Sequence, residues 1–130
     1  MTEESAPYGS PRIAAVIGYG AVGTRHSHNL NRLGYAVRTW DTDPARRTVP
    51  TLHEALDGAT LAVIATPPEF HMAQATAALA MGVPWMLVEK PLALSREEAA
   101  PLLGCNTVFV GYCLRFALAT QLLPDAIKRI

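Results

Sequence analysis

The sequence has 130 residues, 50% of them hydrophobic, and its 11 basic and 11 acidic side chains balance. This length and apolar content suit one domain with a core of its own. The balanced charge argues against binding to nucleic acid or to an anionic membrane through bulk charge, and the most apolar window, residues 72–88, is too short and too interrupted to span a bilayer.

The chain begins with a polar, acidic segment, residues 1–11, which predicts a loose, flexible tail and not a secretory signal. Residues 12–130 are expected to form the domain. Strands are expected where short apolar runs end at glycine, proline or a polar residue: residues 12–17, 36–40, 60–66, 84–88 and 107–110. Helices are expected between and after them: residues 21–33, 52–56, 69–81, a short helix capped by Ser95, and 114–130 with a break or kink at Pro124.

The expected strands are continuous apolar runs that alternate with helices, which is typical of a mostly parallel sheet covered on both faces. We therefore predict an α/β fold of the doubly wound Rossmann type. The fold should be abbreviated, because residues 42–47 are too few for the dozen or more that a parallel crossover needs. The usual third strand and its helix should be absent or vestigial near Thr48 and Val49, which would leave the second strand close to an edge.

A glycine-rich loop with the spacing G-x-G-x-x-G joins the first strand to the first helix. The first glycine permits a tight turn, the second lets a pyrophosphate approach the backbone, and the third lets the helix pack on the sheet, while the amides of the first helical turn face the anion. A turn that merely needs glycines is the alternative, and the strand–helix context favours a dinucleotide. The residues expected to bind it are Gly18, Tyr19 (through its backbone amide), Gly20, Ala21, Val22 and Gly23.

Asp41 follows the second strand, where a carboxylate can accept hydrogen bonds from a ribose diol. A carboxylate would repel a 2′-phosphate, so the predicted cofactor is NAD. Arg46 and Arg47 leave NADP open, although solvated loop charges are an equally good interpretation of both.

Glu89, Lys90 and Pro91 directly follow the apolar strand at residues 84–88. Ligands of open parallel sheets bind beyond the carboxyl ends of the strands, so Lys90 should lie at the same edge as the glycine loop. A lysine there can act as a general base towards a hydroxyl or as an acid towards a carbonyl. Glu89 can hold the ammonium group or tune its proton affinity. A surface pair with no such role is the alternative.

Four motifs, "GYGAVGTRH", "ATPPEFHMAQATAALAMGVP", "VEKPLALS" and "VGYCLRF", occur in an order that resembles the N-terminal domain of the glucose–fructose oxidoreductase / inositol dehydrogenase / rhizopine catabolism family (Gfo/Idh/MocA), from about Arg12 to Phe116. The resemblance implies that Lys90 is the catalytic lysine. It implies that Thr66 and Pro67 line the cofactor groove, that His71 begins the helix below it, and that Arg115 lies near the nicotinamide. Family members oxidise or reduce sugars, inositols and related polyols with NAD(P).

The chain also departs from the family's pattern. Relatives have a second α/β domain that forms the substrate pocket, and we expect no such domain within these 130 residues. One interpretation is the cofactor domain of a sugar or polyol oxidoreductase, incomplete without a second domain or a partner chain. The alternative is a stand-alone NAD(P)-binding module without turnover, as a sensor, scaffold or vestige. A third is a small enzyme that forms its pocket across a homodimer, and the apolar residues between 114 and 123 predict a two-fold dimer.

The cysteines and histidines suggest no metal site. Cys105 and Cys113 form no metal or disulfide pattern, so a reduced, cytoplasmic setting is expected. His26 and His28 are two residues apart on the expected helix, about 200° around its axis, so they cannot chelate one ion together.

Overall fold

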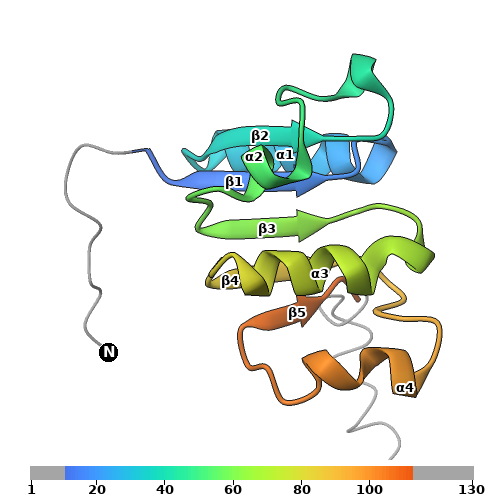
Figure 1. Cartoon of the computed structure of the whole chain (residues 1–130). Coiled ribbons are helices and arrows are strands. Elements are labelled where there is room, and N and C mark those ends of the chain that lie inside the picture. The colour runs from blue at the N-terminus through green and yellow to red at the C-terminus, as the bar shows by residue number, and fades with distance from the viewer. Residues whose placement is uncertain (1–10, 113–130) are drawn as a thin grey trace, which may run out of the picture.

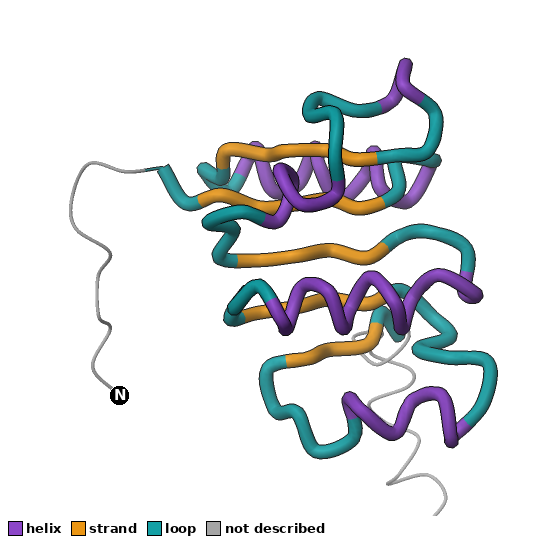
Figure 2. The backbone as a smooth tube through the Cα atoms, viewed as in Figure 1, coloured by secondary structure: helices purple, strands orange, loops and turns teal. Residues whose placement is uncertain are grey.

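Five short apolar segments form one parallel sheet in the order β2-β1-β3-β4-β5, with helices on both faces (Figures 1 and 2). The computed structural model describes residues 11–112. The strands are β1 (Ile13–Ile17), β2 (Ala36–Trp40), β3 (Leu61–Ile64), β4 (Trp85–Val88) and β5 (Val108–Val110). The helices are α1 (Ala21–Arg32), α2 (Leu52–Leu56), α3 (His71–Ala80) and α4 (Arg96–Ala99), with single 3₁₀ turns at Pro44–Arg46, Pro68–Phe70 and Ala100–Leu102.

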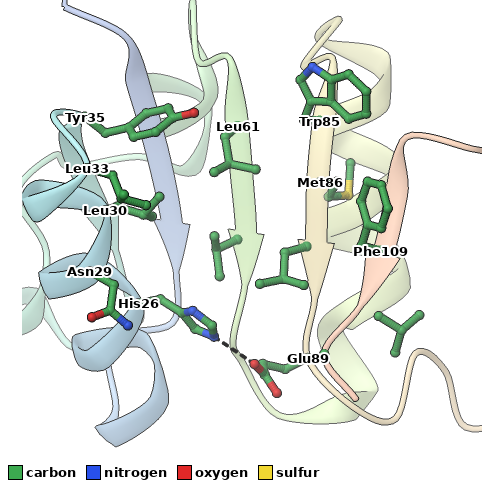
Figure 3. Close-up of a pocket in the computed structure, with 14 residues that line it drawn as sticks. His26, Asn29, Leu30, Leu33, Tyr35, Leu61, Trp85, Met86, Glu89 and Phe109 are labelled. Atoms are coloured by element: carbon green, nitrogen blue, oxygen red, sulfur yellow. Dashed lines mark hydrogen bonds and ion pairs between the residues drawn. The ribbon is translucent and has the colours of Figure 1, made fainter. Parts of the chain in front are cut away.

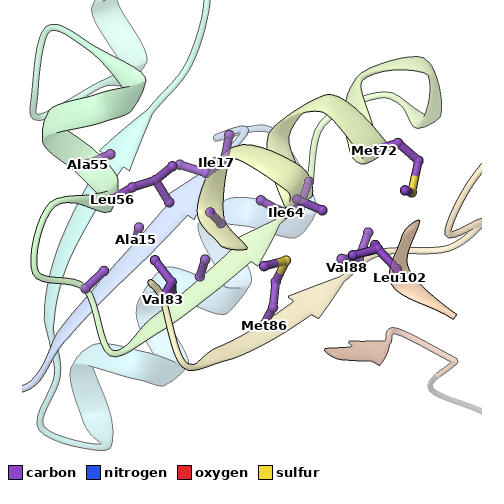
Figure 4. Close-up of a cluster of buried hydrophobic side chains, with 14 residues drawn as sticks. Ala15, Ile17, Ala55, Leu56, Ile64, Met72, Val83, Met86, Val88 and Leu102 are labelled. Carbon is purple, nitrogen blue, oxygen red and sulfur yellow. The ribbon is translucent and has the colours of Figure 1, made fainter. Parts of the chain in front are cut away.

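The sheet separates two hydrophobic clusters because side chains of each strand alternate between its faces. The larger cluster lies under α2 and α3 and includes Ile17, Leu56, Ile64 and Met86 (Figure 4). The smaller one lies under α1 and contains Ala14, Val16, Leu30 and Val63. Burial of β1 on both faces explains why its sequence is a continuous apolar run.

The edge position of β2 confirms the abbreviated topology. Between β2 and α2 the structure has a 3₁₀ turn and irregular chain, with no strand. The N–H groups of Thr48 and Val49 donate to the Thr39 carbonyl at 3.0 and 3.4 Å, so this segment lies against β2 without pairing as a strand. The usual crossover is missing between β2 and α2, as predicted, because the chain there is too short to make one.

Most expected elements are present, with ends one or two residues shorter. The main difference is the helix expected over residues 69–81, which is a 3₁₀ turn followed by α3 from His71, after the rigid Pro67–Pro68 pair. Ser95 caps α4 as predicted, with its Oγ accepting from the Glu98 N–H at 3.1 Å. The helix expected over residues 114–130, Cys113, Arg115 and the apolar dimer face lie outside the described residues, as do residues 1–10 of the tail. Within residues 11–112, no helix is long and apolar enough to cross a membrane.

Candidate cofactor site

The three loop glycines are needed for different reasons. Gly18 has φ +91°, and a Cβ there would lie 2.7 Å from the Ala65 carbonyl carbon. A Cβ at Gly23 would lie 1.8 Å from the Gly18 carbonyl oxygen. Gly20 has φ −79°, which any residue adopts, and a Cβ there would meet nothing within 4 Å. Folding explains Gly18 and Gly23 but not Gly20, whose open position fits a ligand that approaches the backbone.

The N-terminus of α1 is arranged to receive an anion. Gly20 is its N-cap and supplies no side-chain hydrogen bond, and its first turn contains no acidic residue. The first amides of a helix lack intrahelical partners and carry the positive end of its dipole. A pyrophosphate would provide the missing acceptors, so the loop and helix fit a dinucleotide.

A crevice of about 480 Å³ lies at this end of the sheet. It brings together the glycine loop, the residues after β2, the residues after β3 and the beginning of α3. Its lining residues are Gly18, Gly20, Trp40, Asp41, Thr42, Arg46, Ala65, Thr66, Pro67, Phe70 and Gln74. Six positions singled out in the sequence therefore meet in one cavity: Gly18, Gly20, Asp41, Arg46, Thr66 and Pro67.

Asp41 is held at the crevice by the backbone. Its Oδ2 accepts a hydrogen bond from the Tyr19 N–H and its Oδ1 accepts one from the Asp43 N–H, both at 2.8 Å. Burial by itself raises the pKa of Asp41, but these two hydrogen bonds, the charge of Arg46 and the Thr42 hydroxyl outweigh it, so the pKa lies below its usual 3.8. The carboxylate is therefore ionised at neutral pH, and each oxygen keeps a lone pair for a ribose hydroxyl.

We expect the substitution Asp41→Asn to weaken NADH binding roughly 10- to 100-fold, because a hydrogen bond to a charged group contributes about 1.5–3 kcal/mol. Titration of nicotinamide fluorescence measures this loss, with the exposed Asp57→Asn as the matched control. Equal NADH affinity in Asp41→Asn and the parent would contradict a ribose contact.

Because folding lowers the pKa of Asp41, the ionised carboxylate stabilises the fold above pH 3.8, and that contribution is lost as the pH falls through the lowered value.

His71 connects the turns after β3 and β4 from beneath the crevice. It is 1% exposed, and its Nε2 and Nδ1 lie 2.7 Å from the Thr66 carbonyl oxygen and 2.8 Å from the Pro91 carbonyl oxygen. Thr66 also donates its hydroxyl proton to the Gln74 side-chain oxygen. His71 does not line the crevice, so its contacts here are with the backbone that shapes the site.

Lys90 follows β4 at the same edge as the glycine loop, since the ends of β4, β3 and β1 are in register through Val88, Ile64 and Ile17. Its side chain is exposed. Of the two roles expected of Glu89, holding the Lys90 ammonium group is not seen, because no ion pair joins the two residues within residues 11–112. The Glu89 Oε1 instead lies 2.8 Å from Nε2 of His26 on α1, because Glu89 points to the opposite face of the sheet (Figure 3).

Glu89 lines a second cavity of about 730 Å³, between α1 and the exposed sides of β3, β4 and β5 (Figure 3). This groove is mostly apolar: Leu33, Trp85 and Phe109 are 66%, 51% and 48% exposed. Its polar end is the His26–Glu89 pair. Neither Glu89 nor Lys90 lines the crevice beside the glycine loop, and Arg115 lies outside the described residues.

A parallel doubly wound sheet with an anion-binding loop and an acid after its second strand defines a dinucleotide-binding domain of the Rossmann type. A family model described as "Oxidoreductase family, NAD-binding Rossmann fold" matches residues 13–106, more than half of the chain. The chain belongs to this family, Gfo/Idh/MocA, as its four motifs predicted, and contributes the family's NAD-binding domain.

Solved structures of dehydrogenases share the fold. UDP-N-acetylglucosamine 3-dehydrogenase GnnA from Acidithiobacillus ferrooxidans is 27% identical with a TM-score of 0.79, over 91% of this chain and 44% of that one. GenD2 from gentamicin A biosynthesis, in complex with NAD, is 28% identical with a TM-score of 0.64, over 85% and 37%. The WlbA dehydrogenase from Chromobacterium violaceum, with NADH and UDP-GlcNAcA, is 21% identical with a TM-score of 0.77, over 94% and 41%, which shows the fold alone. The chain thus spans less than half the length of these relatives, and no curated protein matches it by sequence.

Sequence reasoning missed most of the residues that line the two cavities, and four of them bear on the site. Trp40, Phe70 and Gln74 line the crevice, and His26 binds Glu89. The sequence contains a signal for Gln74, because this polar residue interrupts an apolar helical pattern. In the structure this residue is buried, with 9% exposed. His26 gave no such signal, since its partner is 63 residues away.

Proposed function

We propose that this chain is the cofactor-binding part of an NAD-dependent oxidoreductase that transfers hydride to or from a sugar, an inositol or a related polyol. The open Gly20 position beside the uncapped N-terminus of α1 carries the proposal, because it fits a pyrophosphate and the surrounding chain leaves room for a side chain there. The ionised Asp41 favours NAD, and Arg46 at the crevice leaves NADP possible. The UDP-sugar dehydrogenase among the similar structures supports a sugar or sugar-nucleotide substrate.

Lys90 is the proposed proton acceptor. During oxidation the substrate hydroxyl would give its proton to the uncharged Lys90 amine, while the hydrogen on the same carbon leaves with its electron pair to NAD⁺, so the alcohol becomes a carbonyl. The exposed lysine at the carboxyl end of β4, beside the crevice edge, supports this role. In the reverse direction the ammonium group would protonate the developing alkoxide.

We expect Lys90→Ala to lower turnover about 10²- to 10⁴-fold and to leave NADH binding unchanged, because the amine moves a proton and is not needed to hold the dinucleotide. Binding is followed by nicotinamide fluorescence and turnover by the appearance of NADH with a panel of sugars, UDP-sugars and inositols. Binding without turnover by the parent protein would favour a stand-alone module, as a sensor, scaffold or vestige. Absence of NAD(H) binding would contradict the proposal itself.

The remaining substrate contacts are proposed to come from a second domain, a partner chain or a second copy in a homodimer. The share of each relative that the chain leaves unmatched supports this, since it exceeds half. A cytoplasmic location is also proposed, in keeping with a nicotinamide cofactor and with the free Cys105.

A further inference from the structure

The pair formed by His26 and Glu89 joins the glycine-loop helix to the turn that carries Lys90 (Figure 3). Nε2 of His26 lies 2.8 Å from Oε1 of Glu89, and the two side chains are only 25% and 21% exposed. With a proton on Nε2, His26 donates to the carboxylate whether the ring is neutral or charged.

Glu89 is confined from two further directions. Its N–H donates to the Ile64 carbonyl at 2.9 Å, which continues the ladder between β3 and β4. On the other side, Gly111 follows β5 and donates its N–H to the Val88 carbonyl at 2.8 Å. A Cβ at Gly111 would lie 2.9 Å from the Glu89 carboxylate, so the carboxylate occupies the space that a side chain would fill.

This confinement decides which side of the sheet the carboxylate occupies. Trp85, Leu87 and Glu89 line the groove under α1, whereas Val88 packs in the cluster on the opposite face. Lys90 lies one residue beyond Glu89, in the bend that follows β4. Lys90 forms no ion pair with any residue between 11 and 112.

We propose that His26 is a positioning residue that holds the carboxylate of Glu89 away from Lys90, which leaves the amine free for the substrate. The proposal rests on the function proposed above. Without His26, the neighbouring carboxylate would lose its partner on α1 and could turn to the ammonium group one residue away. A free amine is the state that can accept a proton, and a lysine paired with a carboxylate is held in its charged form.

Chemical labelling tests this directly, because Lys90 and Lys128 are the two lysines of the sequence. An amine-reactive acylating reagent is applied over a range of pH to the full chain, and mass spectrometry gives the labelling of Lys90 relative to Lys128. In His26→Leu we expect this ratio to fall roughly three- to tenfold at mildly alkaline pH, as an adjacent carboxylate stabilises the charged amine. His28→Leu, at an exposed position of the same helix, should leave the ratio unchanged.

Two rescues separate positioning from a general structural effect. His26→Gln keeps an N–H donor and should restore the ratio, and Glu89→Gln added to His26→Leu should restore it by removing the negative charge. If His26→Leu does not fold, His26→Asn, whose amide is too short to reach Glu89, replaces it. An unchanged ratio in the folded variant, or a lowered ratio that Glu89→Gln does not restore, would overturn the proposal. NADH binding by the parent protein is measured separately, so failure of the proposed function is recognised independently.

Discussion

Replacing Gly20 by valine is expected to abolish NADH binding while the protein stays folded. The backbone at Gly20 has φ −79°, and a Cβ there meets nothing within 4 Å, so the chain itself accepts a side chain. The valine would instead fill the part of the crevice that a pyrophosphate must enter. We expect affinity to fall at least about 100-fold, or about 2.7 kcal/mol, in a fluorescence titration.

Two variants control for this result. Gly20→Ala adds one methyl group and should have a smaller effect, and His28→Ala removes an exposed side chain from the same helix and should have none. Circular dichroism should give the same spectrum for all three variants. Normal NADH binding by Gly20→Val would mean that the dinucleotide does not lie across this loop.

Replacing Gly23 by alanine is expected to destabilise the fold itself. The new Cβ would lie 1.8 Å from the Gly18 carbonyl oxygen, which is backbone and cannot move aside as a side chain can. Either α1 separates from the sheet or the loop distorts, and we expect a loss of about 3 kcal/mol or more, a large part of a typical domain's stability. Thermal or urea unfolding measures this loss.

Gly34, beyond the C-terminal end of α1, provides the matched comparison. It has φ +86° and open space around its Cα, so Gly34→Ala meets only the backbone strain of a left-handed conformation, about 1–2 kcal/mol. Gly23→Ala should therefore be clearly less stable than Gly34→Ala. Equal stability of the two variants would show that α1 does not need its close approach to the loop.

The fold was largely predictable because its signals are local. Continuous apolar runs such as β1 require burial on both faces, and the six residues after Asp41 leave no room for a crossover, so both the parallel sheet and its edge at β2 followed from the sequence. The crevice-lining positions Gly18, Gly20 and Asp41 were predictable because the glycine loop and the acid after the second strand form one recognisable sequence pattern.

The partner of Glu89 was not predictable in the same way. Sequence proximity suggested Lys90, whereas alternation along β4 places Glu89 on the face that α1 covers, and only the packing of α1 brings His26 there. His71 is similar, because its two ring nitrogens lie beside backbone oxygens of separate turns. Contacts between distant segments depend on how the elements pack, which periodicity alone does not specify.

The two tryptophans of the sequence occupy different cavities: Trp40 lines the dinucleotide crevice and Trp85 lines the groove beside α1. The protein consequently contains two built-in optical probes. If Trp85 is replaced by phenylalanine, the emission of Trp40 would report the binding of a nicotinamide dinucleotide through energy transfer. If Trp40 is replaced by phenylalanine, the emission of Trp85 would report the binding of a partner in the groove on the opposite face of the sheet.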